Sequence, residues 1–250
     1  VSVVLFVQCA SPGDYHRREL VYCGSGKPGR SHFCVNLKKT GRSNPPLLLF
    51  MNELTNYLKD FIQEPIVLMD IGASHGIDSR WEPLGDKLIA YGFDADVNEC
   101  EKLNSYGSKT MHFIPQAIGG TNGNVNFYRT QLKDSSGIYQ VNSLFFDRLL
   151  NRDNAHVVGV ESMEVMTLPD AIKKYQLPDP DFIKLDVEGA ELDILKRCSL
   201  LGTFGVYSEF RFHRQINGCP VFSELDQFMT NRRFMLYDLW VNKQSRKHLP

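Results

Sequence analysis

Long apolar runs, an excess of one charge and paired metal-binding cysteines are all missing from this chain of 250 residues. No apolar run approaches the roughly 20 residues that a transmembrane helix needs. Its 28 Lys and Arg nearly balance its 29 Asp and Glu, so the basic face typical of nucleic-acid binding is not indicated. The six cysteines form no C-x-x-C pair, which disfavours a zinc site and favours free thiols over a disulfide framework. Membrane-spanning, nucleic-acid-binding and zinc-binding classes are therefore disfavoured.

The start of the chain has neither basic residues nor an initiator methionine. Residues 1–7 are almost all apolar. A secretory signal begins with basic residues. The segment is either the tail of a clipped signal or a core strand of an excerpt, and the missing basic start favours the excerpt. We expect a cytoplasmic protein.

Length and composition fit one α/β domain with an N-terminal appendage, since 42% of the residues are apolar and 23% charged. Residues 8–46 are rich in Gly, Pro, Ser and basic residues without a period, which predicts loop. Residues 47–62 carry apolar residues at helical spacing. We therefore expect an N-terminal extension over residues 1–60 and a catalytic domain over residues 61–250.

Beyond residue 65, short apolar runs alternate with amphipathic segments. The pattern predicts strands or extended segments over residues 66–70, 88–94, 110–118, 124–130, 158–168, 182–187, 205–212 and 234–241. It predicts helices over residues 78–84, 96–105, 143–150, 169–175, 190–198 and 223–232. We expect residues 124–130 to form a hairpin with the end of 110–118. The alternation favours an α/β fold with a doubly wound, mostly parallel sheet and helices on both faces.

The first two predicted strands each end on an acid, Asp70 and Asp94, and the first is followed by a turn with Gly72 and Gly76. Glycines carry no Cβ, so the turn can pass close to a ligand. An acid at the tip of the second strand is where nucleoside-binding α/β folds hold ribose hydroxyls. The turn lacks the middle glycine of the G-x-G-x-x-G fingerprint that cradles a pyrophosphate. The pattern therefore favours S-adenosylmethionine over NAD.

Three sequence blocks make the pattern specific. They are D-I-G-A-S-H-G at residues 70–76, A-I-G at 117–119 leading into V-N-F-Y at 125–128, and D-F-I-K-L-D-V-E-G-A-E-L-D-I-L-K at 181–196. In these blocks the chain resembles the FkbM family of S-adenosylmethionine-dependent methyltransferases, with similarity over residues 66–240. The resemblance implies a class I, Rossmann-like methyltransferase domain. Such domains normally end in a seventh, antiparallel strand, and the sequence pattern shows none before residue 250.

The resemblance also implies a set of cofactor-binding residues. They are Asp70, Gly72, Ala73, Ser74, Gly76, Asp94, Gln116 and Ala117. Asp70 would lie near the methionine end of the cofactor, unless it only caps the turn. The Asp94 carboxylate would accept both ribose hydroxyls. Ser74 and His75 differ from the residue types of relatives, which leaves their side-chain contacts open.

Two further acids, Asp186 and Glu188, alternate at the end of the strand predicted over residues 182–187, so both can point into the crevice beyond the strand ends. We place Asp186 between cofactor and acceptor. We place Glu188 on the acceptor side, where a carboxylate could orient or deprotonate a hydroxyl. Lys184 could instead pair with one of these acids.

Glu209 and His213, near the end of the strand predicted over residues 205–212, complete the catalytic candidates. Histidine is a common general base, so His213 is a candidate for that role unless it is only a polar loop residue. Two acids and a histidine could hold a divalent ion, but the resemblance requires none, and we expect no metal.

The expected function is transfer of a methyl group from S-adenosylmethionine to a hydroxyl oxygen of a sugar or small natural product. The expected partner is therefore a small-molecule or glycan acceptor, with no nucleic acid. A catalytically silent cofactor-binding module is the alternative, and it predicts loss of the acids at the strand ends. Those acids are present. A nicotinamide-dependent enzyme is disfavoured by the missing glycine.

Overall fold

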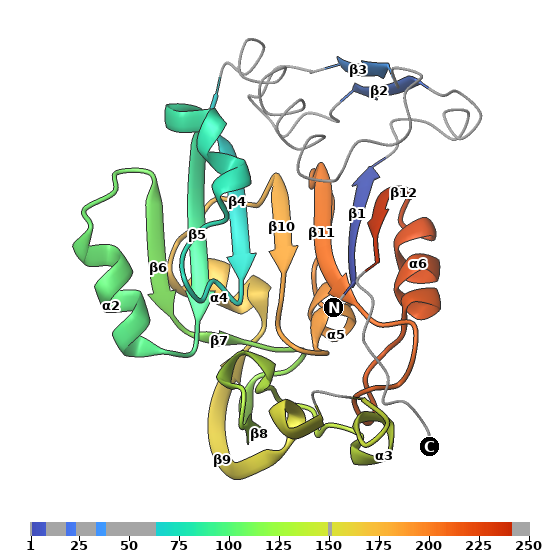
Figure 1. Ribbon diagram of the computed structural model, residues 1–250. Coiled ribbons are helices and arrows are strands. Elements are labelled where there is room, and N and C mark those ends of the chain that lie inside the picture. Colours follow the sequence, from blue (N-terminus) through green and yellow to red (C-terminus); the bar gives the residue numbers. More distant parts are fainter. Residues whose placement is uncertain (1, 9–18, 24–33, 39–63, 150–151, 242–250) are drawn as a thin grey trace.

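The computed structural model describes residues 2–8, 19–23, 34–38, 64–149 and 152–241. Its main sheet has seven strands in the order β12-β1-β11-β10-β4-β5-β6 (Figure 1). These strands are β1 (Ser2–Gln8), β4 (Ile66–Ile71), β5 (Leu88–Asp94), β6 (Met111–Pro115), β10 (Phe182–Leu185), β11 (Gly205–Phe210) and β12 (Phe234–Trp240). The pairs β10–β11, β10–β4, β4–β5 and β5–β6 are parallel. The protein is therefore mixed α/β with a parallel-rich sheet.

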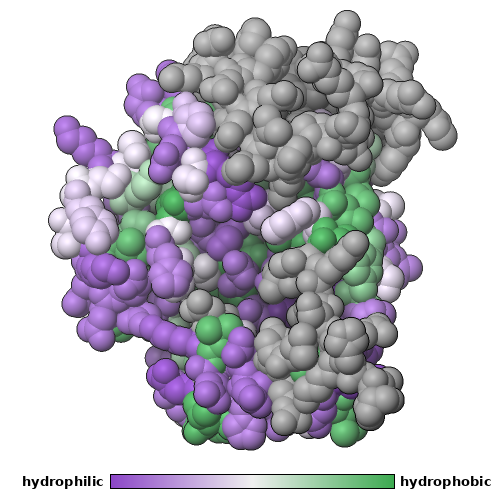
Figure 2. Space-filling model, in the orientation of Figure 1, coloured by the Kyte–Doolittle hydropathy of each residue, from purple (hydrophilic) through white to green (hydrophobic). Residues whose placement is uncertain are grey.

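The central strand β4 is apolar along nearly its whole length because both of its faces are covered. Helices α4 (Leu168–Lys174), α5 (Glu191–Leu195) and α6 (Phe222–Thr230) contribute buried side chains to the core on one face. The 3₁₀ segment η2 (Ser79–Lys87) contributes Trp81 and Leu84 to the other. Helix α2 (Val97–Ser105) contacts β6 and buries only Cys100, so the surface over it is largely hydrophilic (Figure 2).

A second, three-stranded sheet lies beyond the carboxyl ends of β4 and β10 (Figure 1). It consists of β7 (Ala117–Ile118), β9 (Val157–Met166) and β8 (Gly123–Thr130), with β9 in the middle. The single strand predicted over residues 110–118 is therefore wrong. Gln116 N donates to Ile114 O at 2.8 Å, and this tight turn sends the chain from one sheet to the other.

The predicted hairpin between residues 124–130 and the end of 110–118 is also wrong. β8 pairs antiparallel with β9, and β7 pairs parallel with the same strand. The ten residues of β9 offer β8 a longer ladder than the two residues of β7 could, which explains why β8 pairs with β9.

Strand β1 comes from the apolar segment at the start of the chain, for which a core strand was one of the two alternatives, although the expected division assigned residues 1–60 to an extension. It lies antiparallel between β11 and β12, and Leu5 and Phe6 are fully buried. An apolar strand paired on both edges belongs to the core. The sheet thus has an antiparallel strand, supplied from the start of the chain. The rest of the domain division stays a prediction.

Smaller differences concern local segments. The helix predicted over residues 143–150 is the short α3 (Ser143–Phe146), and the one over 78–84 is η2, with Pro83 inside it and a kink at Gly85. Within the expected loop at 8–46, β2 (Glu19–Cys23) and β3 (Cys34–Lys38) form a two-stranded sheet. Two more 3₁₀ turns are η3 (Lys133–Ser135) and η4 (Arg152–Ala155). The helix expected at 47–62 lies outside the described residues. In the described part, no helix has the length and apolarity to cross a membrane.

If β1 is a core strand, truncating its buried side chain must destabilise the fold. We expect Phe6→Ala to lower the free energy of unfolding by about 3–5 kcal/mol, because it leaves a cavity in the main core. Val158→Ala on β9, where the side chain is 63% exposed, is the control and should cost less than about 0.5 kcal/mol. Urea unfolding measures both, and equal small costs would contradict the placement of β1.

Candidate functional site

Two adjoining cavities lie at the carboxyl ends of the parallel strands. The larger, of ≈ 650 Å³, lies between the ends of β4, β5 and β10 and the small sheet. The smaller, of ≈ 390 Å³, lies between the ends of β4, β10 and β11 and the start of η2. Both are lined by Ser74, His75, Lys184 and Asp186, so the glycine turn and the end of β10 form the wall between them.

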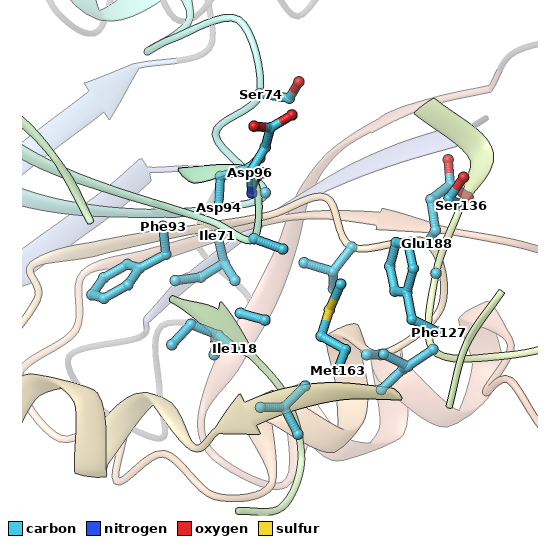
Figure 3. A pocket seen from close by; sticks show the side chains of 18 of the residues that line it. Ile71, Ser74, Phe93, Asp94, Asp96, Ile118, Phe127, Ser136, Met163 and Glu188 are labelled. Carbon is cyan, nitrogen blue, oxygen red and sulfur yellow. Dashed lines mark hydrogen bonds between the residues drawn. The ribbon is translucent and has the colours of Figure 1, made fainter. Parts of the chain in front are cut away.

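The larger cavity has polar ends and an apolar lining. In Figure 3, Ser74, Asp94 and Asp96 lie on one side of it and Ser136 and Glu188 on the other. The apolar lining comes from both sheets and includes Ile71, Phe93, Ile118, Phe127 and Met163. Met163 and Phe127 belong to β9 and β8, so the small sheet closes the cavity opposite the strand ends.

The turn after β4 is held between the two neighbouring strands. Gly72 N and Ala73 N both donate to Phe93 O, at 2.9 and 3.1 Å. Gly72 has φ +82°, and a Cβ there would lie 2.0 Å from Asp186 O. Only glycine fits, because the turn packs directly on the backbone that follows β10. Ala73 is fully buried behind the turn, while Gly76 lines the smaller cavity.

Asp70 is a buried acid paired with a buried lysine. Lys184 Nζ lies 2.9 Å from Asp70 Oδ1 and 3.7 Å from Asp186 Oδ2, and it donates to Gly72 O at 3.0 Å. Asp70 is 1% exposed, and neither of its oxygens accepts a hydrogen bond of good geometry from a described residue. Burial raises the pKa of Asp70 to about 6, against the lowering effect of the Lys184 charge. The sequence suggested that Lys184 pairs with Asp186 or Glu188, and the structure places it nearer to Asp70 than to Asp186.

Asp94 lies at the end of β5 and lines the larger cavity. Its Oδ1 accepts a hydrogen bond from Asp96 N at 2.8 Å, which fixes the carboxylate at the start of α2. Burial raises its pKa above the usual value. Asp96 caps α2 by accepting from Glu99 N at 3.2 Å, so the two acids have separate roles.

Gln116 and Ala117 line the same cavity at the point where the chain leaves the main sheet. The Gln116 Oε1 accepts from Lys174 Nζ at 3.1 Å, and its Nε2 donates to Ala117 O at 3.2 Å. The side-chain amide of Gln116 is therefore already hydrogen-bonded within the protein, and it contributes to the cavity mainly as part of its wall.

A cluster of three acids around one arginine lies at the other end of the larger cavity. Arg211 Nη2 donates to Glu188 Oε2 and, at 3.1 Å, to Glu209 Oε2. Burial raises the pKa of Glu188 to about 7 and that of Glu209 well above its usual value, while the Arg211 charge lowers both. Glu191, nearly fully buried, accepts from Val187 N at 3.2 Å and Gly189 N at 3.1 Å, which stabilises the turn that carries Glu188.

A comparison with protein-family models shows which family the chain belongs to. The model of the methyltransferase FkbM domain matches residues 70–236. The chain belongs to the FkbM methyltransferase family. A search of curated proteins found no match. The family assignment confirms the resemblance seen in the sequence and supports methyltransferase activity.

The structure brings together most of the candidate residues predicted from the sequence. Ten of the twelve candidates line one or both cavities: Asp70, Gly72, Ser74, Gly76, Asp94, Gln116, Ala117, Asp186, Glu188 and Glu209. Ala73 packs behind the turn. His213 is exposed, lines neither cavity and has its ring 6.2 Å from that of Phe145. The structure therefore separates His213 from the other candidates.

The sequence analysis missed Arg211, Phe127 and Met163. Arg211 lies two residues after Glu209 in the sequence, and this spacing is a signal that could have placed it on the same side of the chain. Phe127 and Met163 reach the cavity only through the pairing of β8 with β9, for which the sequence has no local signal. No group of His, Cys, Asp and Glu within the described part is arranged to hold a metal ion. The expectation of no metal stays a prediction.

The buried Asp70–Lys184 pair predicts a pH-dependent stability. Because the folded-state pKa of Asp70 lies above its usual value of 3.8, its contribution to stability is largest at low pH and is lost as the pH rises through about 6. Lys184→Met leaves the ionised Asp70 without its cation, so we expect it to cost about 3–5 kcal/mol at pH 8. The cost should shrink at pH 5, where Asp70 is protonated.

Urea unfolding of parent and variant at pH 5 and pH 8 measures this difference. Lys196→Met is the control, since its ion pair with Asp193 is exposed and should contribute at most about 1 kcal/mol at either pH. An equal cost of Lys184→Met at the two pH values would contradict the assignment of the raised pKa to Asp70.

Proposed function

We propose that this protein transfers a methyl group from S-adenosylmethionine to a hydroxyl oxygen of a small molecule or glycan. The observation that carries the proposal is the larger cavity, which presents Asp94 and Glu188 on opposite sides in a domain of the FkbM methyltransferase family. A nucleoside-binding acid and an ionisable group for the acceptor are thereby combined in one site.

The residues present fit S-adenosylmethionine. Asp94 offers a carboxylate for the ribose hydroxyls, and Ile71, Phe93 and Ile118 offer apolar surface for a base. Just before the turn, the buried Asp70 carboxylate, paired with Lys184, lines the smaller cavity, and Ser74 lines both cavities. This donor set suits a nucleoside with a charged amino-acid tail. The turn has no further glycine to cradle a pyrophosphate, as NAD would require.

S-adenosylmethionine, when bound, supplies a methyl group activated by a sulfonium. The protein then has to align the acceptor, exclude water and receive the hydroxyl proton. The apolar residues of the small sheet exclude water from the side opposite the strand ends. Glu188 receives the proton, because a carboxyl with a pKa of about 7 is half ionised near neutral pH. Asp186, at the wall shared by the two cavities, orients the acceptor beside the cofactor.

The acceptor class and the fold class belong to the same proposal. A sugar or small natural product fits an open cavity with carboxylates and serines at its polar ends. The sheet order supports a doubly wound, class I Rossmann-like arrangement, because β4, β5 and β6 lie on one side of β10 and β11 on the other. The antiparallel position in that sheet is taken by β1. The cytoplasmic location stays a prediction.

The first prediction tests the cofactor. We expect the protein to bind S-adenosylmethionine or S-adenosylhomocysteine with a micromolar dissociation constant, roughly −8 kcal/mol, and not to bind NAD. Asp94→Ala should weaken this binding by about 1.5–3 kcal/mol, because a charged acceptor for the ribose is lost. Glu101→Ala, on the exposed face of α2, is the control. Calorimetry measures all three, and NAD binding without a response to either nucleoside would disprove the proposal.

A second prediction separates acceptor chemistry from cofactor binding. Glu188→Gln keeps the side-chain shape and should leave cofactor affinity unchanged while lowering kcat about 10²-fold or more, because the proton acceptor is gone. Asp186→Asn should weaken cofactor binding as well. A screen of hydroxylated metabolites and glycans with labelled cofactor supplies the acceptor for the assay. Equal losses of cofactor affinity in both variants would show that neither side chain is purely catalytic. Full activity of Glu188→Gln would move the proton acceptor to Glu209.

A further inference from the structure

One nitrogen of Arg211 contacts an acid from the lining of each cavity. Its Nη2 contacts both Glu188, which lines the larger cavity, and Glu209, which lines the smaller one. The side chains of Arg211, Glu188 and Glu209 are 7%, 15% and 4% exposed. Arg211 is therefore a buried cation whose charge is shared between two carboxylates.

The second terminal nitrogen of Arg211 is also unusual. Nη1 is buried, and no described residue accepts a hydrogen bond from it. A buried N–H group without a partner costs free energy, so packing alone does not explain an arginine here. The cost is consistent with a functional requirement for the charge of this side chain.

The position of the Glu188 carboxylate is set by its contacts with other side chains. Its φ is +55°, in the left-handed region that non-glycine residues rarely adopt, and Gly189 follows with φ +116°. Glu191 fixes the backbone of this turn through Val187 N and Gly189 N. Arg211 is the group that contacts the Glu188 carboxylate itself.

We propose that Arg211 is a positioning residue for methyl transfer: it holds the Glu188 carboxylate at the cavity wall and keeps it ionised, and Glu209 anchors it from behind. The assignment rests on the proposed function only in giving Glu188 the hydroxyl proton. The contact itself exists in the free protein and can be tested without cofactor or acceptor.

The charges around Glu188 support this role. Asp186 and Glu191 face it and raise its pKa, as burial does, while Arg211 lowers it. Glu209 is more deeply buried, and burial together with the Glu188 charge raises its pKa well above the usual value, while the Arg211 charge lowers it. Removing the arginine charge must then raise the pKa of Glu188, which moves its ionisation above neutral pH.

The test is a pH titration of the Glu188 carboxyl carbon by NMR in ¹³C-glutamate-labelled protein, with the signal assigned from Glu188→Gln. We expect Arg211→Met to move the midpoint upward by about 1–3 pH units. Arg211→Gln keeps an amide N–H donor on a shorter side chain and removes the charge, so it gives an upward shift as well if the Met variant does not fold. Arg214→Met is the matched control, because the ion pair of Arg214 with Glu224 is exposed, and its midpoint should equal that of the parent.

An unchanged Glu188 midpoint in a folded Arg211→Met or Arg211→Gln protein would overturn the proposal. With an acceptor in hand, the rising limb of the kcat–pH profile should move up by the same amount, and Arg211→Lys should restore part of it by restoring the charge. A kcat loss that is equal at pH 7 and pH 9 would mean that Arg211 is only structural, and it too would overturn the proposal. A shifted midpoint in a protein that binds no S-adenosylmethionine would uphold the charge coupling and disprove the proposed function.

Discussion

The contact between the Gly72 turn and the backbone of Asp186 is the constraint on which the rest of the site depends. The two turns approach so closely that a Cβ on residue 72 would lie 2.0 Å from Asp186 O. This approach brings the end of β4 against the end of β10, which in turn places Lys184 Nζ beside Asp70 and within hydrogen-bond distance of Gly72 O. The wall shared by the two cavities is built from these same turns.

Two clusters of charged side chains border the cavities, and they differ in how deeply their acids are buried. Lys184 lies 2.9 Å from the buried Asp70 and 3.7 Å from the more exposed Asp186. Around Arg211 there are more acids than cations, since Glu188 and Glu209 share one guanidinium nitrogen. Buried ion pairs are weak sources of stability because desolvation offsets their attraction. The main effect of these clusters is on the pKa values of the acids at the cavity walls, as for Asp70 and Glu188.

The small sheet turns a row of strand ends into a cavity. Without β8 and β9, the polar residues at the ends of β4, β5 and β10 would face open solvent, where charge effects are weak. Phe127 and Met163 cover them from the opposite side. Burial is also the largest cause of the raised pKa of Glu188.

The sequence by itself determined the alternation of strands and helices and the residues at the strand ends. Apolar runs ending on Asp70, Asp94 and Asp186 are local signals, because parallel strands need continuous apolar segments and their carboxyl ends meet at one edge. The glycine turn was recognisable for the same local reason. These features gave the FkbM resemblance, which the family match confirms.

Only the tertiary structure decided which strands pair and which distant side chains meet. β1 could not be placed in the sheet, and β9 could not be placed between β7 and β8, because pairing partners depend on contacts far apart in the sequence. The same limit hid Arg211, whose charge matters only after β11 lies beside β10. It also hid that His213 lines neither cavity. Local pattern fixes what each segment is, whereas burial and charge at the site arise only once the segments pack together.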